Sequence, residues 1–136
     1  MARTPIRVMP DAFRGGLHDT MSTYATAVWL PVLGPAAWAA WRTLAHGIRR
    51  HPTGWSTSTE QLAAMLGLGS TAGNQCAIAR ALRRLERFAV TRRLGDDMLI
   101  VRCRLPNVTT EQLARLHPDV QIAHRQLSLL RDAMAT

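Results

Sequence analysis

The stretch ARALRRLERFAVTRRL, Ala79–Leu94, carries six arginines in sixteen residues, and their spacing decides how the surrounding chain is interpreted. On a helix of about 3.6 residues per turn, the apolar residues form one continuous core face. These residues are Ile78, Ala81, Leu82, Leu85, Phe88 and Ala89. Arg80, Arg83 and Arg87 fall on the opposite side with Arg84 on the flank, and only Glu86 lies on the helix to neutralise them. The spacing predicts a helix with one buried face and one arginine face.

Around this helix, the sequence predicts a domain over residues 35–105 that contains a helix, a strand, two helices and a β-hairpin, in that order. The expected elements are a helix from Pro35 to about His51, a strand at Trp55, a short helix capped by Ser58 or Thr59, a helix over 74–88 and a hairpin over 89–105. We therefore expect a fold that is mainly α-helical with one small β-hairpin.

The flanking segments are expected to be simpler. Residues 1–19 mix Pro, Gly and Arg without a period and predict a flexible arm. Residues 20–34 form an apolar entry segment, in which Tyr24–Leu30 suits a strand or an extended piece that ends at Pro31. Residues 106–136 predict a helical extension, with Thr109 or Thr110 as one cap and Pro118 at the start of the last helix.

The order of elements and two motifs resemble the winged helix-turn-helix family. The motifs are EQLAAMLGLGS (Glu60–Ser70) and IARALRRLERFAV (Ile78–Val90), followed by the hairpin. A further resemblance links the chain to a group of small winged-helix proteins of actinobacterial type, through the LPVLGP entry (Leu30–Pro35) and an arginine-containing exit that ends in Leu105-Pro106. That second resemblance implies no function.

The family resemblance implies binding to double-stranded DNA, most often by a bacterial transcriptional regulator. Helix 74–88 would enter the major groove and hairpin 89–105 would form the wing. The resemblance places nearest the base edges Asn74, Gln75, Arg80 and Arg83. Arg suits guanine there, and Asn or Gln suits adenine. Arg84 and Arg87 would meet phosphates. On the hairpin, the expected contacts to phosphate or the minor groove are Arg92, Arg93, Arg102 and Arg104.

The distribution of charge supports a polyanionic partner. The net charge is +8 and every basic residue is Arg. Residues 36–105 hold eleven arginines and four acidic residues, a net charge of +7, so the excess is concentrated in the predicted domain. A genome-wide preference for Arg would have spread the charge along the chain. Nucleic acid is the commonest partner for such a patch.

Two features depart from the family pattern. The turn GLGSTAGNQ (Gly67–Gln75) is longer than the usual tight turn, which leaves the register of the arginine helix open. The wing tip, Gly95-Asp96-Asp97, is acidic and would be repelled by phosphate. Two alternatives therefore stay open: the arginines form a solvated face, or the fold serves only protein–protein contacts. The second alternative would use the last helix and the tryptophans, Trp29, Trp38, Trp41 and Trp55, which we otherwise assign to packing.

The last helix carries a short heptad seam that suggests a homodimer. The seam residues are Val120, Ala123, Leu127, Leu130 and Met134. The alternative, which the sequence leaves equally open, is that the helix folds back on its own domain through Leu127 and Leu130.

Other classes of function find little support in the sequence. It shows no Ser/His/Asp set, glycine-rich phosphate loop or paired carboxylates, so we expect no enzyme and no cofactor. Cys76 and Cys103 lack metal-ligand spacing and suit buried thiols. Residues 20–41 are uncharged, but Pro31, Gly34 and Pro35 interrupt them, so a membrane span is not expected. The expectation is a cytoplasmic, nucleoid-associated protein.

Overall fold

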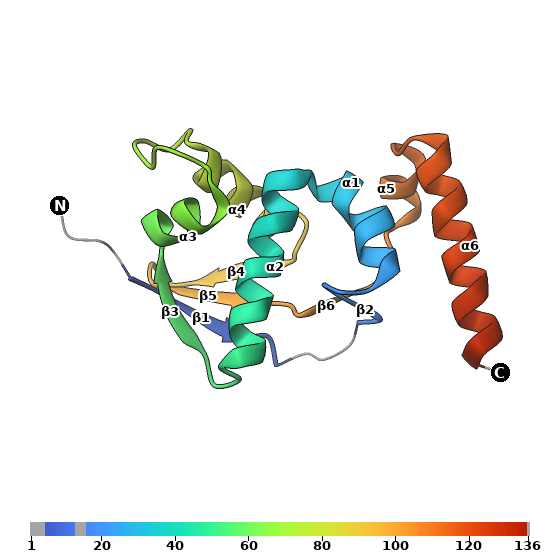
Figure 1. The fold of residues 1–136 in the computed structure, drawn as a ribbon, viewed down its shortest axis with the longest axis horizontal. Helices are drawn as coiled ribbons and strands as arrows, with labels where there is room; N and C mark the ends of the chain where they lie inside the picture. The colour runs from blue at the N-terminus through green and yellow to red at the C-terminus, as the bar shows by residue number, and fades with distance from the viewer. Residues whose placement is uncertain (1–4, 13–15, 136) are drawn as a thin grey trace.

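The computed structural model describes residues 5–12 and 16–135 and shows a mixed α/β fold, with helices packed on one face of a small sheet (Figure 1). Within residues 35–105 the elements follow the predicted order. They are α2 (Pro35–Arg50), β3 (Trp55–Ser58), α3 (Thr59–Leu66), α4 (Ala77–Arg87), β4 (Thr91–Leu94) and β5 (Met98–Val101). The expectation of a mainly α fold with a lone hairpin is corrected, because the hairpin belongs to a four-stranded sheet.

The N-terminal segment supplies a strand of that sheet. β1 (Pro5–Pro10) lies between β3 and β5, antiparallel to β3 and parallel to β5, in the order β3-β1-β5-β4. The prediction of a flexible arm over 1–19 is therefore wrong for residues 5–10. Ile6 and Val8 are buried while Pro5 and Arg7 are exposed, which is the alternation of a half-buried strand. The flanking prolines concealed this short pattern.

The N-terminal segment pairs with the chain a second time. β2 (His18–Asp19) is antiparallel to β6 (Arg104–Leu105). Arg104, predicted to lie on the hairpin, therefore belongs to a separate two-stranded sheet. The hairpin itself covers 91–101, with Leu94 opposite Met98, so its turn has three residues.

The apolar entry segment is helical, so the expected strand over Tyr24–Leu30 is also corrected. A π-helical turn, η1 (Ala25–Trp29), continues into α1 (Leu30–Leu33). The buried side chains of this segment recur at intervals of three and four residues, which suits one face of a helix. The buried set is Tyr24, Ala25, Val28, Trp29, Val32 and Leu33. Gly34, at a φ of +85° that favours glycine, then turns the chain into α2.

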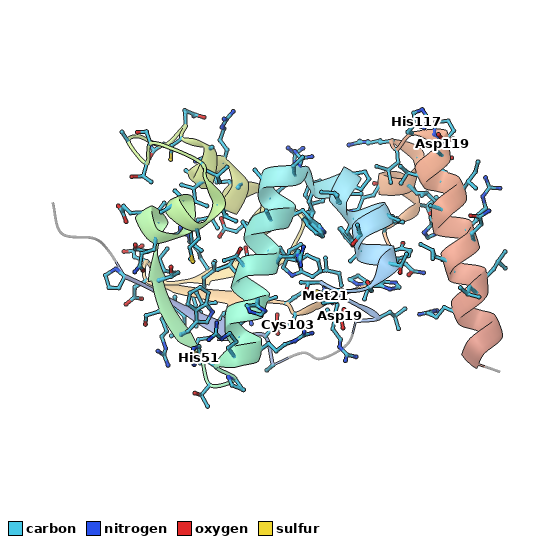
Figure 2. The ribbon with its side chains drawn as sticks, viewed as in Figure 1. Asp19, Met21, His51, Cys103, His117 and Asp119 are labelled. Atoms are coloured by element: carbon cyan, nitrogen blue, oxygen red, sulfur yellow. The ribbon has the colours of Figure 1, made fainter. Side chains whose placement is uncertain are left out.

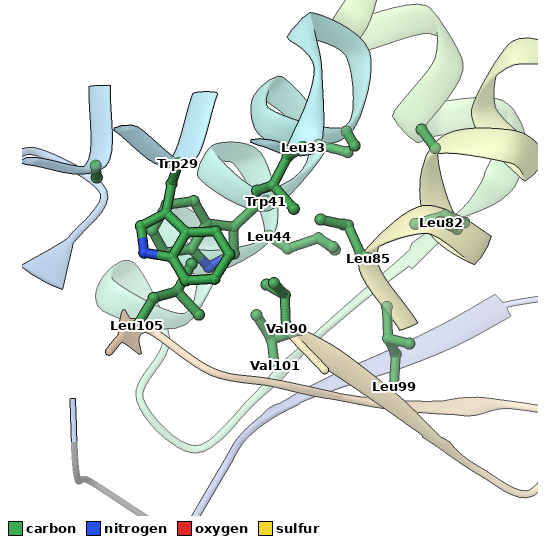
Figure 3. Close-up of a cluster of buried hydrophobic side chains, with 14 of the residues drawn as sticks. Trp29, Leu33, Trp41, Leu44, Leu82, Leu85, Val90, Leu99, Val101 and Leu105 are labelled. Carbon is green, nitrogen blue, oxygen red and sulfur yellow. The ribbon is translucent and has the colours of Figure 1, made fainter. Parts of the chain in front are cut away.

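The core lies between α2, α4 and the sheet (Figure 3). Trp41 and Leu44 of α2 are fully buried beside Leu85 of α4 and Val101 of β5. The Trp41 indole N–H donates to the Arg102 carbonyl at 2.7 Å, so its polar atom is satisfied inside the core.

The remaining tryptophans also pack rather than form a separate surface. Trp29 is buried, and its N–H donates to the Pro106 carbonyl at 2.8 Å. Trp38 and Trp55 are partly buried against the same core. The assignment of the tryptophans to packing is confirmed.

The expected caps are partly confirmed. Ser58 caps α3 by accepting the Gln61 N–H, and Thr109 forms a capping box with Gln112 at the start of α5 (Thr110–Ala114). α4 begins at Ala77 rather than at residue 74, with Cys76 as its N-cap and no side-chain cap bond. Asn74 therefore lies in the loop before the helix.

The last helix, α6 (Pro118–Ala135), folds back against η1 at the end of the molecule opposite α3 (Figure 1). The hydroxyl of Tyr24 lies 2.8 Å from Nδ1 of His124 and accepts the Val108 N–H at 3.0 Å. The ring of His18 stacks on Tyr24 at 3.9 Å, and its Nε2 lies 2.6 Å from Oδ1 of Asn107. This polar network joins α6 to the rest of the chain.

We predict that β1 contributes to stability. Val8→Ala should lower the free energy of unfolding by about 2 kcal/mol, because Val8 has no exposed surface and two carbon atoms leave the core. Urea denaturation checks this, with Arg7→Ala at an exposed position of β1 as the control. Equal stability of Val8→Ala and the wild type would contradict the burial of Val8 in the sheet.

We also predict acid sensitivity from His18. Burial lowers the pKa of its ring, and Arg131 and His124 act in the same direction, against Asn107 and Asp19. The unfolded chain therefore binds more protons than the folded protein, so stability should fall as pH drops below about 6.5. His18→Gln should flatten this dependence, measured by urea denaturation between about pH 7 and pH 5. His51→Gln, at an exposed site, should leave it unchanged.

Candidate nucleic-acid interface

The surface of α4 divides as its sequence predicts. Ile78, Ala81, Leu82 and Leu85 are buried, with no more than 6% of any of them exposed. All four arginines of the helix are exposed: Arg80, Arg83, Arg84 and Arg87. The core face and the arginine face are therefore confirmed.

No described acidic residue forms an ion pair with any of the α4 arginines. Nδ1 of His117 lies 3.7 Å from Oδ2 of Asp119 and accepts the Asp119 N–H, but this contact is at the start of α6, away from α4 (Figure 2). Glu86, the acid on α4 itself, is likewise without an ion pair to them. The positive charge of α4 is thus left for solvent or for a partner.

Arg84 uses its guanidinium group inside the protein. Its Nε donates to the Leu33 carbonyl at 2.6 Å and its Nη2 to the Val32 carbonyl at 2.9 Å. Its Cζ also lies 5.2 Å from the centre of the Phe88 ring. The last carbonyl groups of a helix lack partners within the helix, so Arg84 supplies donors to the end of α1. This binding competes with its predicted role as a phosphate contact.

Arg83 holds the loop that precedes α4. Its Nη1 donates to the Asn74 carbonyl at 2.6 Å. Asn74 and Gln75 are exposed in this loop. Of the four predicted base-reading residues, Asn74 and Gln75 therefore sit beside the start of α4, while Arg80 and Arg83 lie on it. The guanidinium groups of Arg80 and Arg87 form no hydrogen bond or ion pair with any described residue.

The arginines of the hairpin region do not gather on one face. Arg93 lies opposite Leu99, a core residue, so it points to the side of the sheet that carries the helices. Arg92 lies opposite Ile100 and points to the other side. Arg102, just after β5, is partly buried.

A cavity of about 580 Å³ opens between the start of α2 and the arginine face of α4. We call it the arginine pocket. Its lining is Leu33, Gly34, Pro35, Ala36, Ala37, Gln75, Ala77, Arg80, Ala81, Arg83, Arg84 and Arg87. The contribution of α2 was missed from the sequence, because nothing local shows that its first residues lie against α4. Its first turn does carry a signal in hindsight, since it contains no acidic residue.

A larger cavity, of about 1140 Å³, lies along the other side of α2. Trp38 lines it with the Arg42 guanidinium 5.0 Å from its ring, and Arg104 also lies there. Figure 2 shows Asp19, Met21 and Cys103 beside this part of α2. Burial raises the pKa of the Cys103 thiol.

Most residues of the predicted dimer seam are partly buried against the same chain and do not form a free surface. Val120 and Leu127 pack against the core, and Ala123 is partly buried. Leu130 is 58% exposed, and the Met134 side chain lies outside the described part of the molecule. The fold-back alternative therefore describes α6, although through Val120 and Leu127 rather than Leu130.

Residues 5–12 and 16–135 lack two further features that would indicate a function. No helix there is both long and apolar enough to cross a membrane. No group of three or more His, Cys, Asp or Glu residues there could hold a metal ion.

The fold resembles that of a solved structure, residues 1–300 of primosome protein DnaB from Geobacillus stearothermophilus. The TM-score is 0.53 at 18% sequence identity, over 93% of this chain and 46% of that one. The protein thus spans less than half of the chain it resembles, and at this identity the likeness concerns the fold alone. No protein-family model and no curated protein sequence matches the chain.

We predict that Arg84 and Arg87 differ in their effect on stability. Arg84→Ala should lower the free energy of unfolding by about 1–2 kcal/mol, because two carbonyl groups at the end of α1 lose a charged donor. Arg87→Ala should change it by less than about 0.5 kcal/mol. Urea denaturation checks both. Equal effects would show that the Arg84 hydrogen bonds contribute nothing.

Proposed function

We propose that this protein binds double-stranded DNA through a winged-helix module, with the arginine face of α4 in the major groove. The observation that carries the proposal is that face of α4. Its four arginines are exposed, on the side of the helix opposite the buried face, and have no acidic partner among the described residues. Like charges three and four residues apart disfavour a helix by tenths of a kcal/mol per pair. A phosphate backbone would relieve that repulsion and would bind through counterion release.

The arrangement of α4 suits groove entry. The major groove, about 12 Å wide, admits one α-helix. Arg80 and Arg87 have free guanidinium groups and are the first candidates for base edges and phosphates. Asn74 and Gln75 would reach the DNA from the loop, while Arg84 would mainly hold α4 in place.

The sheet departs from the simplest winged helix in a way that is compatible with DNA binding. β1 separates β3 from β5, but the β4–β5 hairpin keeps its position at one edge. The wing contact would come from Arg93, which shares the helix side of the sheet. Asp96 and Asp97 are exposed at the turn, and their charge would keep the tip away from phosphate.

Transcriptional regulation is the role we propose for this binding, as the family resemblance implies. Homodimerisation and nucleoid location remain predictions. A pair of α6 helices would have to meet through its exposed apolar residues, Ile122, Leu129 and Leu130, since Val120 and Leu127 are occupied. Sedimentation tests the dimer.

We predict that DNA binding depends on Arg80 and Arg87. The double variant Arg80→Ala/Arg87→Ala should bind a random 30-base-pair duplex at least about tenfold more weakly, because two contacts are lost. The slope of log affinity against log salt should also fall, by about 0.9 for each phosphate contact. Fluorescence anisotropy across a salt series measures both.

The matched control is Arg50→Ala/Arg125→Ala, which removes the same charge from exposed positions of α2 and α6. It should bind within about twofold of the wild type. No binding by the wild type at low salt would overturn the proposed function and favour a protein–protein module. Equal losses in both double variants would show attraction by net charge alone.

A further inference from the structure

The arginine pocket combines side-chain and backbone donors from two elements distant in sequence. α4 supplies Arg80, Arg83, Arg84 and Arg87, and α2 supplies its first turn. None of the described residues that line the pocket is acidic. A hollow lined by charges of one sign raises the local concentration of counter-ions, and here those counter-ions are anions.

The α2 side of the pocket offers free backbone donors. The helix has no side-chain cap, and its first N–H to bond backward is that of Trp38, to the Gly34 carbonyl at 2.9 Å. Among the described residues, nothing accepts a hydrogen bond from the N–H of Ala36 or Ala37. These donors lie at the positive end of a sixteen-residue helix.

The α4 side is held in place. Arg84 binds the carbonyls of Leu33 and Val32, the two residues just before Gly34. The corner between α1 and α2 is therefore fixed against α4, and the pocket is formed before any ligand arrives. Arg80 and Arg87, one turn before and after Arg84, keep their guanidinium groups unpaired. Such forks match the oxygens of a phosphate.

We propose that the arginine pocket binds one phosphate group, held by the guanidinium groups of Arg80 and Arg87 and by the N–H groups of Ala36 and Ala37. This proposal rests on the proposed function: the phosphate group belongs to the backbone of the DNA that α4 enters. The cavity exceeds a single tetrahedral anion, which leaves room for the sugars on either side of a phosphodiester. The pocket would then fix how deeply α4 sits in the groove.

The test places a carboxylate where the phosphate would bind. Ala36 lines the pocket at the second position of α2, where an acidic side chain favours the helix. Ala36→Glu should therefore keep the fold and occupy the site. Ala36→Gln matches its size without the charge, and Gln126→Glu makes the same charge change at an exposed position of α6.

The first measurement is a titration of each ¹⁵N-labelled protein with inorganic phosphate, at ionic strength held constant with chloride. In the wild type, Ala36→Gln and Gln126→Glu, the amide signals of residues 36 and 37 should shift and saturate. In Ala36→Glu they should not respond. Shifts that never saturate, or that persist unchanged in Ala36→Glu, would show that the arginine pocket does not bind phosphate.

The second measurement identifies the source of the phosphate, through DNA affinity across the salt series. Ala36→Glu should lower the log–log slope by about 0.9 relative to Gln126→Glu, the loss of one contact. Equal slopes with wild-type DNA affinity retained would overturn the pocket as a DNA contact and leave the proposed function standing. Saturable binding of inorganic phosphate by a protein that does not bind DNA would confirm the anion site. It would overturn both DNA as the source of the phosphate and the proposed function.

Discussion

The burial of α2 between α4 and the sheet is the constraint on which the other features depend. Trp41 has no exposed surface, and its N–H donates to the Arg102 carbonyl beside the end of β5. A side chain of this size, satisfied at both its apolar and polar ends, fixes α2 relative to the hairpin. With α2 fixed, its first turn lies against α4, and the two helices together line the arginine pocket.

The arginines of α4 look equivalent in sequence but serve different purposes. Arg84 donates to Val32 and Leu33, so it replaces the hydrogen bonds that the end of α1 lacks. Arg83 donates to Asn74 and orders the long loop. Arg80 and Arg87 keep their donors free. The same structure thus uses two guanidinium groups to build the surface and leaves two for a ligand.

The parallel pairing of β1 with β5 ties the N-terminal segment to the candidate wing. Besides the strand pairing, the Arg7 N–H donates to the Asp97 carbonyl at the hairpin turn at 2.7 Å. A wing anchored along one strand has less freedom to bend than an isolated hairpin. Its orientation relative to α4 is therefore set by the sheet, and the candidate contact from Arg93 is set with it.

The sequence alone determined the elements whose signals are local. The periodicity of Ile78, Leu82 and Leu85 predicted the two faces of α4. The hydroxyls of Ser58 and Thr59 placed the start of α3 to within one residue. Both signals depend on residues within one or two turns. Tertiary structure decided what depends on distant partners: the place of β1 in the sheet, the carbonyls that Arg84 binds, and the face of α6 that packs. A period-2 pattern of four residues between prolines is too short to identify a strand, and a guanidinium group carries no local sign of which carbonyl it will meet. Those choices follow from burial and from unsatisfied helix ends, which exist only once the chain has folded.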